Sequence, residues 1–309
     1  MRHILIDTDT ASDDAIALIM ALRNPEVKVE AITLVAGNVP VELGLQNALY
    51  TCELCGVKVP LYRGAAKPLM RELETAQFVH GEDGMGDIGL DLQGRKEDEG
   101  HAVDVIIDTI HKFDGDLELV TLGPLTNIAL AILKDPSIVG KVKKCTIMGG
   151  IGEGVGNITP VSEFNIWVDP EAASIVFDSG MNMQMVGWDI SRKYATFDEE
   201  QSDKLRSIGT KYAHFTVDIQ KTLVEFSKKV SKLAGFDLPD PIAMAVAIDP
   251  SVATRIEKHN VEVICHDGTT RGQTVVDHTD ISKRPMNMDV VLEASREKFV
   301  KMLENSLAE

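Results

Sequence analysis

His3-Ile4-Leu5-Ile6-Asp7-Thr8-Asp9-Thr10-Ala11-Ser12-Asp13-Asp14 joins a short apolar run to four carboxylates within eight residues. The run His3–Ile6 is short, apolar and typical of a buried strand. From Asp14 to Leu22 the apolar residues recur at helical spacing. The segment therefore predicts a strand, a tight acidic turn and a helix.

The acidic turn needs a physical reason, because like charges at this density repel one another. Ser12 or Asp13 could cap the following helix. The helix N-terminus offsets one or two of the charges, by ~0.3–1 kcal/mol each. This leaves the other carboxylates unexplained. A hard divalent cation such as Ca²⁺ or Mg²⁺ would account for them, since both ions take oxygen ligands.

Strand-like and helical patterns alternate through the first 190 residues. Further strands are expected at Val27–Val35, Val59–Tyr62, Leu117–Leu122, Lys144–Met148 and Met183–Val186. Further helices are expected at Val41–Cys55, Ala102–His111, Leu125–Leu133 and Glu171–Phe177. This alternation predicts an α/β fold with an open, mostly parallel twisted sheet, a Rossmann-like core covered by helices on both faces. Ligands of such sheets bind beyond the carboxyl ends of the strands.

The C-terminal part has a different pattern. Helices are expected at Glu199–Ile208, Thr210–Leu233, Pro241–Ala247 and Asp289–Leu303, with a hairpin of Val261–Cys265 and Gln273–Val276. No Pro/Ser/Gly-rich linker divides the chain, so we expect one domain over residues 1–309. The long acidic loop Arg63–Gly100 is of a kind that is often functional.

Composition excludes several classes of function. Lys and Arg number 31 against 48 Asp and Glu, a formal net charge of −17 that opposes nucleic acid or an anionic membrane as partner. No stretch approaches the ~18 apolar residues of a membrane span. Cys52 and Cys55 form a CxxC without a second pair for zinc, and they are expected to be small buried residues on a helix face. A cytoplasmic location follows.

Two metal-dependent chemistries compete for the acidic turn. In a phosphatase of the haloacid dehalogenase type, Asp7 would be the nucleophile and Asp9 the acid/base. That pattern requires Thr or Val where this chain has Ala11, and also a later Lys and an acidic pair that cannot be placed.

The second interpretation rests on nine motifs in chain order. They are Asp7-x-Asp9-x-x-x-Asp13-Asp14, Gly37-Asn38, His80-Gly81-Glu82-Asp83-Gly84, Leu122-Gly123-Pro124-Leu125-Thr126-Asn127, Met148-Gly149-Gly150, Gly156-Asn157-Ile158-Thr159-Pro160-Val161-Ser162-Glu163-Phe164-Asn165, Asp169-Pro170-Glu171-Ala172-Ala173, Asp240-Pro241 and Ile248-Asp249-Pro250. This set resembles the nucleoside hydrolases, the inosine-uridine preferring family of ribosidases. The resemblance runs from about residue 3 to residue 250.

The resemblance implies a role for each matched residue. A Ca²⁺ ion would be held by Asp9, Asp14, Asp240 and the backbone carbonyl of Leu122, and Asp9 would also be the general base that deprotonates the attacking water. The reaction would pass through an oxocarbenium-like state, as in other glycoside hydrolysis. The matched ribose-binding residues are Asp13, Asn38, Asn157, Glu163 and Asn165. The expected partner is a small-molecule ribonucleoside, and relatives suggest a homodimer or homotetramer.

Each matched residue also has a local structural explanation. Asn38 and Asn157 suit turns. Glu163 and Asn165 alternate about Phe164 as in a strand. Asp240 between two prolines could be a helix N-cap. Asp249, in a second Asp-Pro, is taken as structural.

One position departs from the family pattern. Where many members carry the histidine that protonates the leaving base, and some purine-specific members a tryptophan, this chain has Pro239. His80 is then the remaining candidate for leaving-group activation. A ribose- or nucleoside-binding relative without turnover is the non-enzymatic alternative, although a retained Asp9 favours catalysis. For the base itself, Trp167, Tyr212, Gln220, Phe226 and Phe236 could contact it or simply pack.

Overall fold

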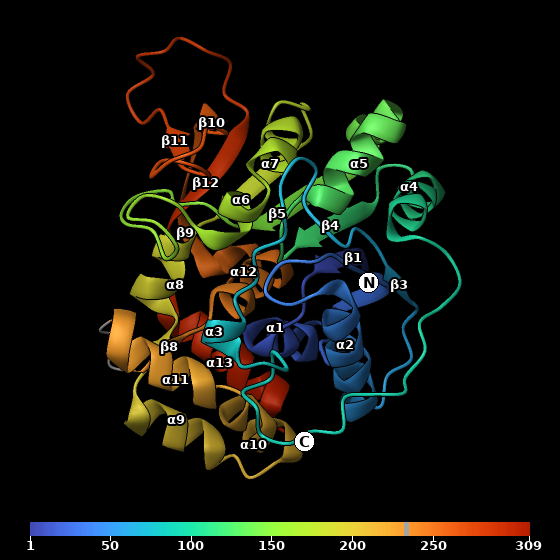
Figure 1. Cartoon of the computed structure of the whole chain (residues 1–309), viewed down its shortest axis with the longest axis vertical. Helices are drawn as coiled ribbons and strands as arrows, with labels where there is room; N and C mark the ends of the chain where they lie inside the picture. Colours follow the sequence, from blue (N-terminus) through green and yellow to red (C-terminus); the bar gives the residue numbers. More distant parts are fainter. Residues whose placement is uncertain (232–234) are drawn as a thin grey trace.

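The central sheet of the computed structural model confirms the predicted α/β architecture (Figure 1). The structure describes residues 1–231 and 235–309. Across the eight-stranded sheet the order is β3 (Leu61–Arg63), β2 (Val27–Leu34), β1 (Arg2–Thr8), β4 (Leu117–Thr121), β5 (Val142–Met148), β6 (Met183–Val186), β12 (Met288–Ala294) and β9 (Ala253–His259). Neighbouring strands are parallel except for the antiparallel edge pair β12–β9.

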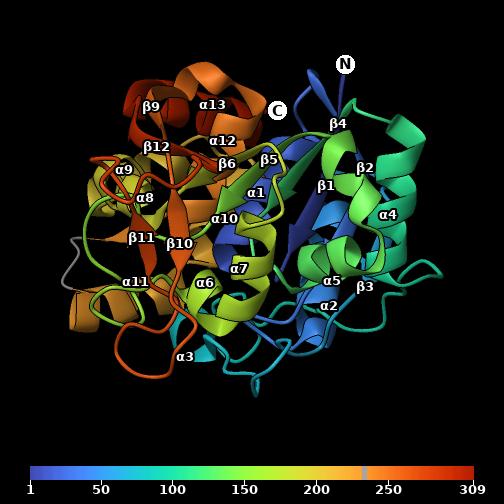
Figure 2. The same cartoon turned by 90° about the horizontal axis from the view of Figure 1, so that it is seen from above.

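Helices cover both faces of this sheet (Figures 1 and 2). One face carries α1 (Ser12–Leu22), α2 (Val41–Cys55), α12 (Pro239–Ile248) and α13 (Arg296–Leu307). The other carries α4 (Ala102–Phe113), α5 (Thr126–Lys134) and α7 (Pro170–Phe177). Strand β1 alternates between these two cores, since Ile4 and Ile6 pack in the first and Leu5 in the second. None of the helices in the described part of the chain is long and apolar enough to cross a membrane.

The remaining elements connect these strands and helices. They are α3 (Gln77–His80), α6 (Phe164–Val168), α8 (Trp188–Tyr194), α9 (Glu199–Arg206), α10 (Lys211–Asp218), α11 (Lys221–Phe226), a π-helical turn Ser227–Ser231, the pair β7 (Thr196–Phe197) and β8 (Phe236–Asp237), the hairpin β10 (Val261–Val263) and β11 (Thr274–Val276), and the 3₁₀ turns Pro136–Lys141 and Pro250–Val252. The predicted hairpin is confirmed. Figure 1 shows α9, α10 and α11 together at one end of the molecule, away from that hairpin.

Two predicted helices were wrong in extent. Residues 289–294 belong to strand β12, and the C-terminal helix begins only at Arg296, capped by Ser295. Val290, Val291 and Leu292 are buried between the two cores, and a strand covered on both faces has no alternation that separates it from a helix.

The long helix expected at Thr210–Leu233 is also interrupted. It is divided into α10 and α11 at Ile219 and Gln220, and its last two residues lie outside the described residues. The edge strand β9 was not predicted. The two cysteines of the CxxC lie on α2 as expected, where burial raises the pKa of the Cys52 thiol to about 12.

Candidate active site

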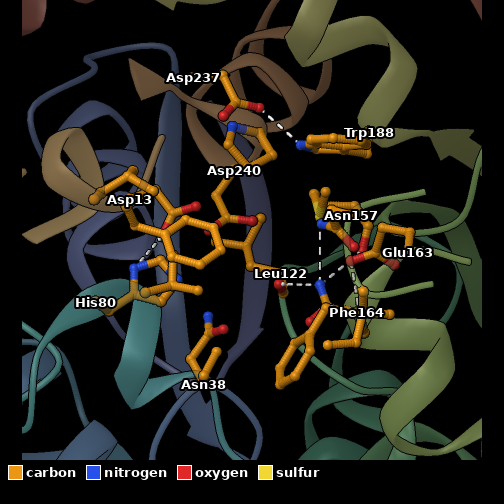
Figure 3. Close-up of a pocket in the computed structure, with 18 of the residues that line it drawn as sticks. Asp13, Asn38, His80, Leu122, Asn157, Glu163, Phe164, Trp188, Asp237 and Asp240 are labelled. Carbon is orange, nitrogen blue, oxygen red and sulfur yellow. Dashed lines mark hydrogen bonds and ion pairs between the residues drawn. The ribbon is translucent and has the colours of Figure 1, made fainter. Parts of the chain in front are cut away.

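A cavity lies at the carboxyl edge of the sheet, and the segments that follow six parallel strands, β1 to β6, contribute to it (Figure 3). Its lining includes eight of the residues singled out from the sequence: Asp13, Asn38, His80, Leu122, Asn157, Glu163, Asn165 and Asp240. The rest of the lining is Ala76, Phe78, Val79, Met148, Ile158, Phe164, Trp188, Leu223, Phe226, Ser227, Asp237 and Pro239. Residues up to 227 positions apart in sequence, Asp13 and Asp240, therefore meet in one site.

Three carboxylates gather on one wall of the cavity. One oxygen from each of Asp13, Asp14 and Asp240 lies within 4.8 Å of the other two, and all three residues are buried. This group contains Asp13, whereas the ligand set implied by the resemblance contains Asp9.

Asp9 is fully buried beside this group, and one of its two carboxylate oxygens is hydrogen-bonded by the described residues. The backbone N–H of Asn38 donates to Asp9 Oδ2 at 2.6 Å. Among the described residues, Oδ1 of Asp9 and Oδ1 of Asp13 are buried without a hydrogen-bond partner. A buried oxygen without a donor is costly, so these atoms are suited to a cation.

Two glycines make room for the Asp9 carboxylate. A Cβ atom on Gly37 would overlap Asp9 Oδ2, and one on Gly123 would lie 2.7 Å from Asp9 Oδ1. Both glycines belong to the matched motifs. Their lack of a side chain is what allows the loops after β2 and β4 to close on Asp9.

The acidic turn enters helix α1 differently from the expected capping. The N-cap is Ala11, not Ser12 or Asp13. Asp14, in the first turn, accepts a hydrogen bond from the Ala11 backbone N–H at 2.9 Å, and its other oxygen accepts one from Thr8 Oγ1 at 2.5 Å. These two hydrogen bonds fix the side chain of Asp14 at the start of α1.

Asp240 is not the helix N-cap that its two flanking prolines suggested. Helix α12 begins at Pro239 and its N-cap is Leu238, so Asp240 lies inside the first turn. The prolines lack the N–H groups that would be unpaired at these positions. The carboxylate of Asp240 does not cap the helix and points toward the other acids (Figure 3).

Electrostatics in this cluster favour a bound cation. Burial raises the pKa of Asp9, Asp13, Asp14 and Asp240, and the neighbouring carboxylates raise it further for Asp9, Asp14 and Asp240. Among the described residues no Lys or Arg pairs with these four. In the part of the chain that the structure describes, the basic group at ion-pair distance is His80, whose Nδ1 lies 3.7 Å from Asp13 Oδ1. An all-oxygen donor set with this much unbalanced charge fits a hard divalent cation.

The opposite wall of the cavity is built around Glu163 and Asn165. The expected strand alternation is wrong here, because Glu163 caps helix α6. Its carboxylate accepts backbone N–H bonds from Gly150 at 2.8 Å, Asn165 at 2.8 Å and Ile166 at 3.2 Å. Burial raises the pKa of Glu163 to about 7. Asn157, in the preceding loop, is exposed at the rim.

His80 comes from α3, the short helix within the long loop 63–100. Its Nδ1 lies 2.9 Å from Ser12 Oγ, which in turn approaches Gln220 Oε1 at 3.4 Å. Burial lowers the pKa of His80 to about 4. The imidazole is therefore neutral at pH 7.

Of the residues considered for the base, the structure places only Phe226 in the cavity lining. Its ring meets Phe78 edge-on, with centroids 5.7 Å apart. Phe236 and Tyr212 pack in the core, and Gln220 contacts Ser12. Trp167 lies outside this cavity lining, with the Arg271 guanidinium 3.9 Å from its ring centroid.

Sequence reasoning missed Phe78, Ser227, Trp188 and Asp237. Two local signals could have found the last two residues. Trp188 follows the end of β6 at the same edge as the other loops, and Asp237 lies three residues before Asp240. Neither residue belongs to a matched motif.

Comparison with known proteins identifies relatives over nearly the whole chain. The family model described as "Inosine-uridine preferring nucleoside hydrolase" matches residues 4–301. An inosine-uridine preferring nucleoside hydrolase of Leishmania major is 38% identical over 301 residues, which cover 96% of this chain and 95% of the relative. A pyrimidine-specific ribonucleoside hydrolase of Salmonella agona is 37% identical over 306 residues, covering 98% of this chain and 97% of the relative.

Solved structures show the same fold. A plant nucleoside hydrolase superimposes with a TM-score of 0.94 at 32% identity, covering 99% of both chains. A purine-preferring ribonucleoside hydrolase from Gardnerella vaginalis superimposes with a TM-score of 0.91 at 33% identity, covering 99% of this chain and 98% of that one. This chain therefore shares its overall α/β fold with solved nucleoside hydrolases.

The chain belongs to the inosine-uridine preferring nucleoside hydrolase family. It is a nucleoside hydrolase, an enzyme acting on ribonucleosides. The match over nearly the whole chain favours this family over the phosphatase considered from the acidic turn alone.

Proposed function

We propose that this chain hydrolyses the N-glycosidic bond of ribonucleosides to ribose and free base in a Ca²⁺-dependent reaction. One observation carries the proposal. Three buried carboxylates, of Asp13, Asp14 and Asp240, lie close together next to the buried Asp9, and Asp9 and Asp13 each have a buried oxygen that no described residue satisfies.

The cation would be held by Asp9, Asp14, Asp240 and the backbone carbonyl of Leu122. Asp13 is left for ribose, because it lines the cavity while Asp9 and Asp14 do not. When bound, the ion neutralises the cluster and lowers the pKa of a nearby water.

The remaining steps are assigned to side chains of this protein. Asp13, Asn38, Asn157, Glu163 and Asn165 offer carboxylate and amide groups to the ribose hydroxyls. Asp9 takes a proton from the water that attacks C1′. The C1′–N bond breaks and its electron pair leaves with the base. His80, neutral and fixed near Ser12, activates the departing base by a hydrogen bond.

The test is ribose release from a panel of nucleosides and from p-nitrophenyl riboside, with Ca²⁺ and with a chelator. We expect cleavage that the chelator abolishes and Ca²⁺ restores. Cleavage unaffected by the chelator would refute the metal requirement. Failure to cleave either class would leave only ligand binding.

The variant His80→Ala tests the proposed role of His80 in activating the leaving base. We expect a larger loss on inosine than on p-nitrophenyl riboside, because p-nitrophenolate leaves without assistance. Equal losses on the two substrates would remove His80 from leaving-group activation.

We further propose that the enzyme assembles as a homodimer or homotetramer. The family resemblance supports this assembly. Light scattering on the purified chain gives the mass that decides it, and a monomer would contradict the proposal.

A further inference from the structure

Asp237 is a buried carboxyl group at one end of the cavity, and its two oxygens have different surroundings. Oδ2 accepts hydrogen bonds from Trp188 Nε1 and from Ser191 Oγ, each at 2.8 Å. Among the described residues no hydrogen bond to Oδ1 is found, and Oδ1 is not among the fully enclosed unpartnered atoms. The protein therefore holds one oxygen of Asp237 and leaves Oδ1 free to contact a ligand, and in the protonated form of the group Oδ1 can donate a hydrogen bond.

The position of Asp237 relates it to the part of the substrate that is not ribose. The groups assigned to ribose and cation are Asp13, Asn38, Glu163, Asn165 and Asp240. Figure 3 shows Asp237 and Trp188 together at the end of the cavity opposite Asn38, with Asp240 between. Asp237 therefore lies beyond the sugar site, where the base would be.

Apart from the residues assigned to ribose and cation, the cavity lining is mostly apolar. It includes Phe78, Leu223, Phe226 and Pro239, and its polar side chains besides Asp237 include His80 and Ser227. Neutral His80 and Ser227 can each give a hydrogen bond. Of the lining side chains not assigned to ribose or cation, Asp237 is the one that ends in a carboxyl group, which is a proton donor when protonated.

We propose that Asp237 is the general acid that protonates the leaving base, an inference that rests on the proposed function. As the C1′–N bond breaks, its electron pair passes to the base, and the proton on Asp237 Oδ1 is transferred to a nitrogen or oxygen of the base. Asp237 is left as a carboxylate, while Asp9 holds the proton taken from water. Proton exchange with solvent restores both groups before the next turnover.

The surroundings of Asp237 agree with this role. Burial raises the pKa of Asp237, whereas the hydrogen bonds from Ser191 and Trp188 and the charge of Arg192 lower it. The other titratable groups that sense it are Asp13, a like charge, and His80, which is neutral at pH 7. The two hydrogen bonds also stabilise the carboxylate that remains after proton transfer.

The test compares Asp237→Asn with the wild-type enzyme on inosine and on p-nitrophenyl riboside, both with Ca²⁺. The asparagine carbonyl can keep the bonds from Trp188 and Ser191, but its amide cannot give up a proton. We expect kcat on inosine to fall ~10²–10⁴-fold and kcat on p-nitrophenyl riboside to be unchanged. Asp108→Asn makes the same chemical change at an exposed position of α4 and should retain full activity on both substrates.

The pH profile gives a readout that packing alone would not change. Wild-type kcat on inosine should fall as the pH rises through the pKa of Asp237, because only the protonated acid is active. This alkaline limb should be absent with p-nitrophenyl riboside and in Asp237→Asn. Equal losses on both substrates, full activity of the variant on inosine, or an unchanged alkaline limb would each overturn the proposal. A wild-type enzyme that cleaves neither substrate would overturn the proposed function first, and this inference with it.

Discussion

The side-chain amide of Asn165 donates a hydrogen bond of 2.8 Å to the backbone carbonyl oxygen of Leu122. The same amide group approaches the Met148 carbonyl at 3.3 Å. A residue assigned to ribose is thereby tied to a carbonyl assigned to the cation. This bond orients the Leu122 oxygen, which has a second lone pair for a metal.

Asn165→Asp should weaken cation binding and activity. The new carboxylate would face two carbonyl oxygens and could no longer donate to them. We expect a loss of ~10–100-fold in Ca²⁺ affinity, measured by calorimetry, and a parallel loss of turnover.

The matched control is Asn182→Asp, because the Asn182 amide donates to the Lys143 carbonyl at 2.7 Å on the exposed surface. That variant should bind Ca²⁺ normally. Unchanged Ca²⁺ affinity in Asn165→Asp would contradict the proposed ligand role of Leu122.

Gly123→Ala should displace the general base. Its methyl group would lie 2.7 Å from Asp9 Oδ1, so either the loop or the carboxylate must move. A displacement of about 1 Å at a reacting group costs ~10²-fold in rate. Initial rates on p-nitrophenyl riboside measure this, since that substrate needs no leaving-group acid.

Gly140→Ala serves as the control for this change. A Cβ at Gly140 meets open space. We expect its rate and its melting temperature to match those of the wild type. Full activity of Gly123→Ala would show that Asp9 tolerates the shift and is not the positioned base.

Glu163 predicts a pH dependence of stability. Its folded-state pKa is about 7, raised by burial from 4.5. Because the folded-state pKa is raised, the contribution of protonated Glu163 to the free energy of unfolding is fully present below pH 4.5 and is lost as the pH rises through 7. The loss is about 1.4 kcal/mol for each pKa unit.

Urea unfolding in chelator between pH 4.5 and 7.5 checks this dependence. The free energy of unfolding of the wild type minus that of Glu163→Gln should decrease as the pH rises. The exposed Gln93→Asn, which changes no titratable group, serves as the control. A pH-independent difference for Glu163→Gln would rule out the buried titration.

Substitutions of Phe226 and Phe236 should distinguish an effect on substrate binding from an effect on folding stability. Phe226 lines the cavity beside Phe78, so Phe226→Ala should raise KM for nucleosides about 2- to 10-fold, for ~0.5–1.5 kcal/mol of aromatic contact. Phe236 is 1% exposed in the core, so Phe236→Ala should lower the free energy of unfolding by ~3–5 kcal/mol. Nucleoside kinetics and urea unfolding on both variants provide the comparison. A reversed pattern would contradict the placement of the two rings.

The sequence by itself determined the alternation of strands and helices and the residues that converge. The acidic turn, the Gly-Asn after β2 and the end of β4 could be assigned to one edge, because parallel strands bring their carboxyl ends together. The motif from Gly156 to Asn165 and the role of the Leu122 carbonyl came from the resemblance to the nucleoside hydrolases. The first group of features depends on local patterns and on one general property of parallel sheets.

Only the tertiary structure decided the features that depend on contacts distant in sequence. Residues 289–294 form a strand because β6 and β9 flank them, and no local period records that burial on both faces. Phe226 was distinguished from Phe236, and Asp237 was found beside Trp188, only when α8, β8 and α11 packed around the cavity. Short-range patterns determine the local conformation of the chain. The neighbours of a side chain depend instead on which helices and strands pack in the same core. No local stretch of the sequence specifies that packing.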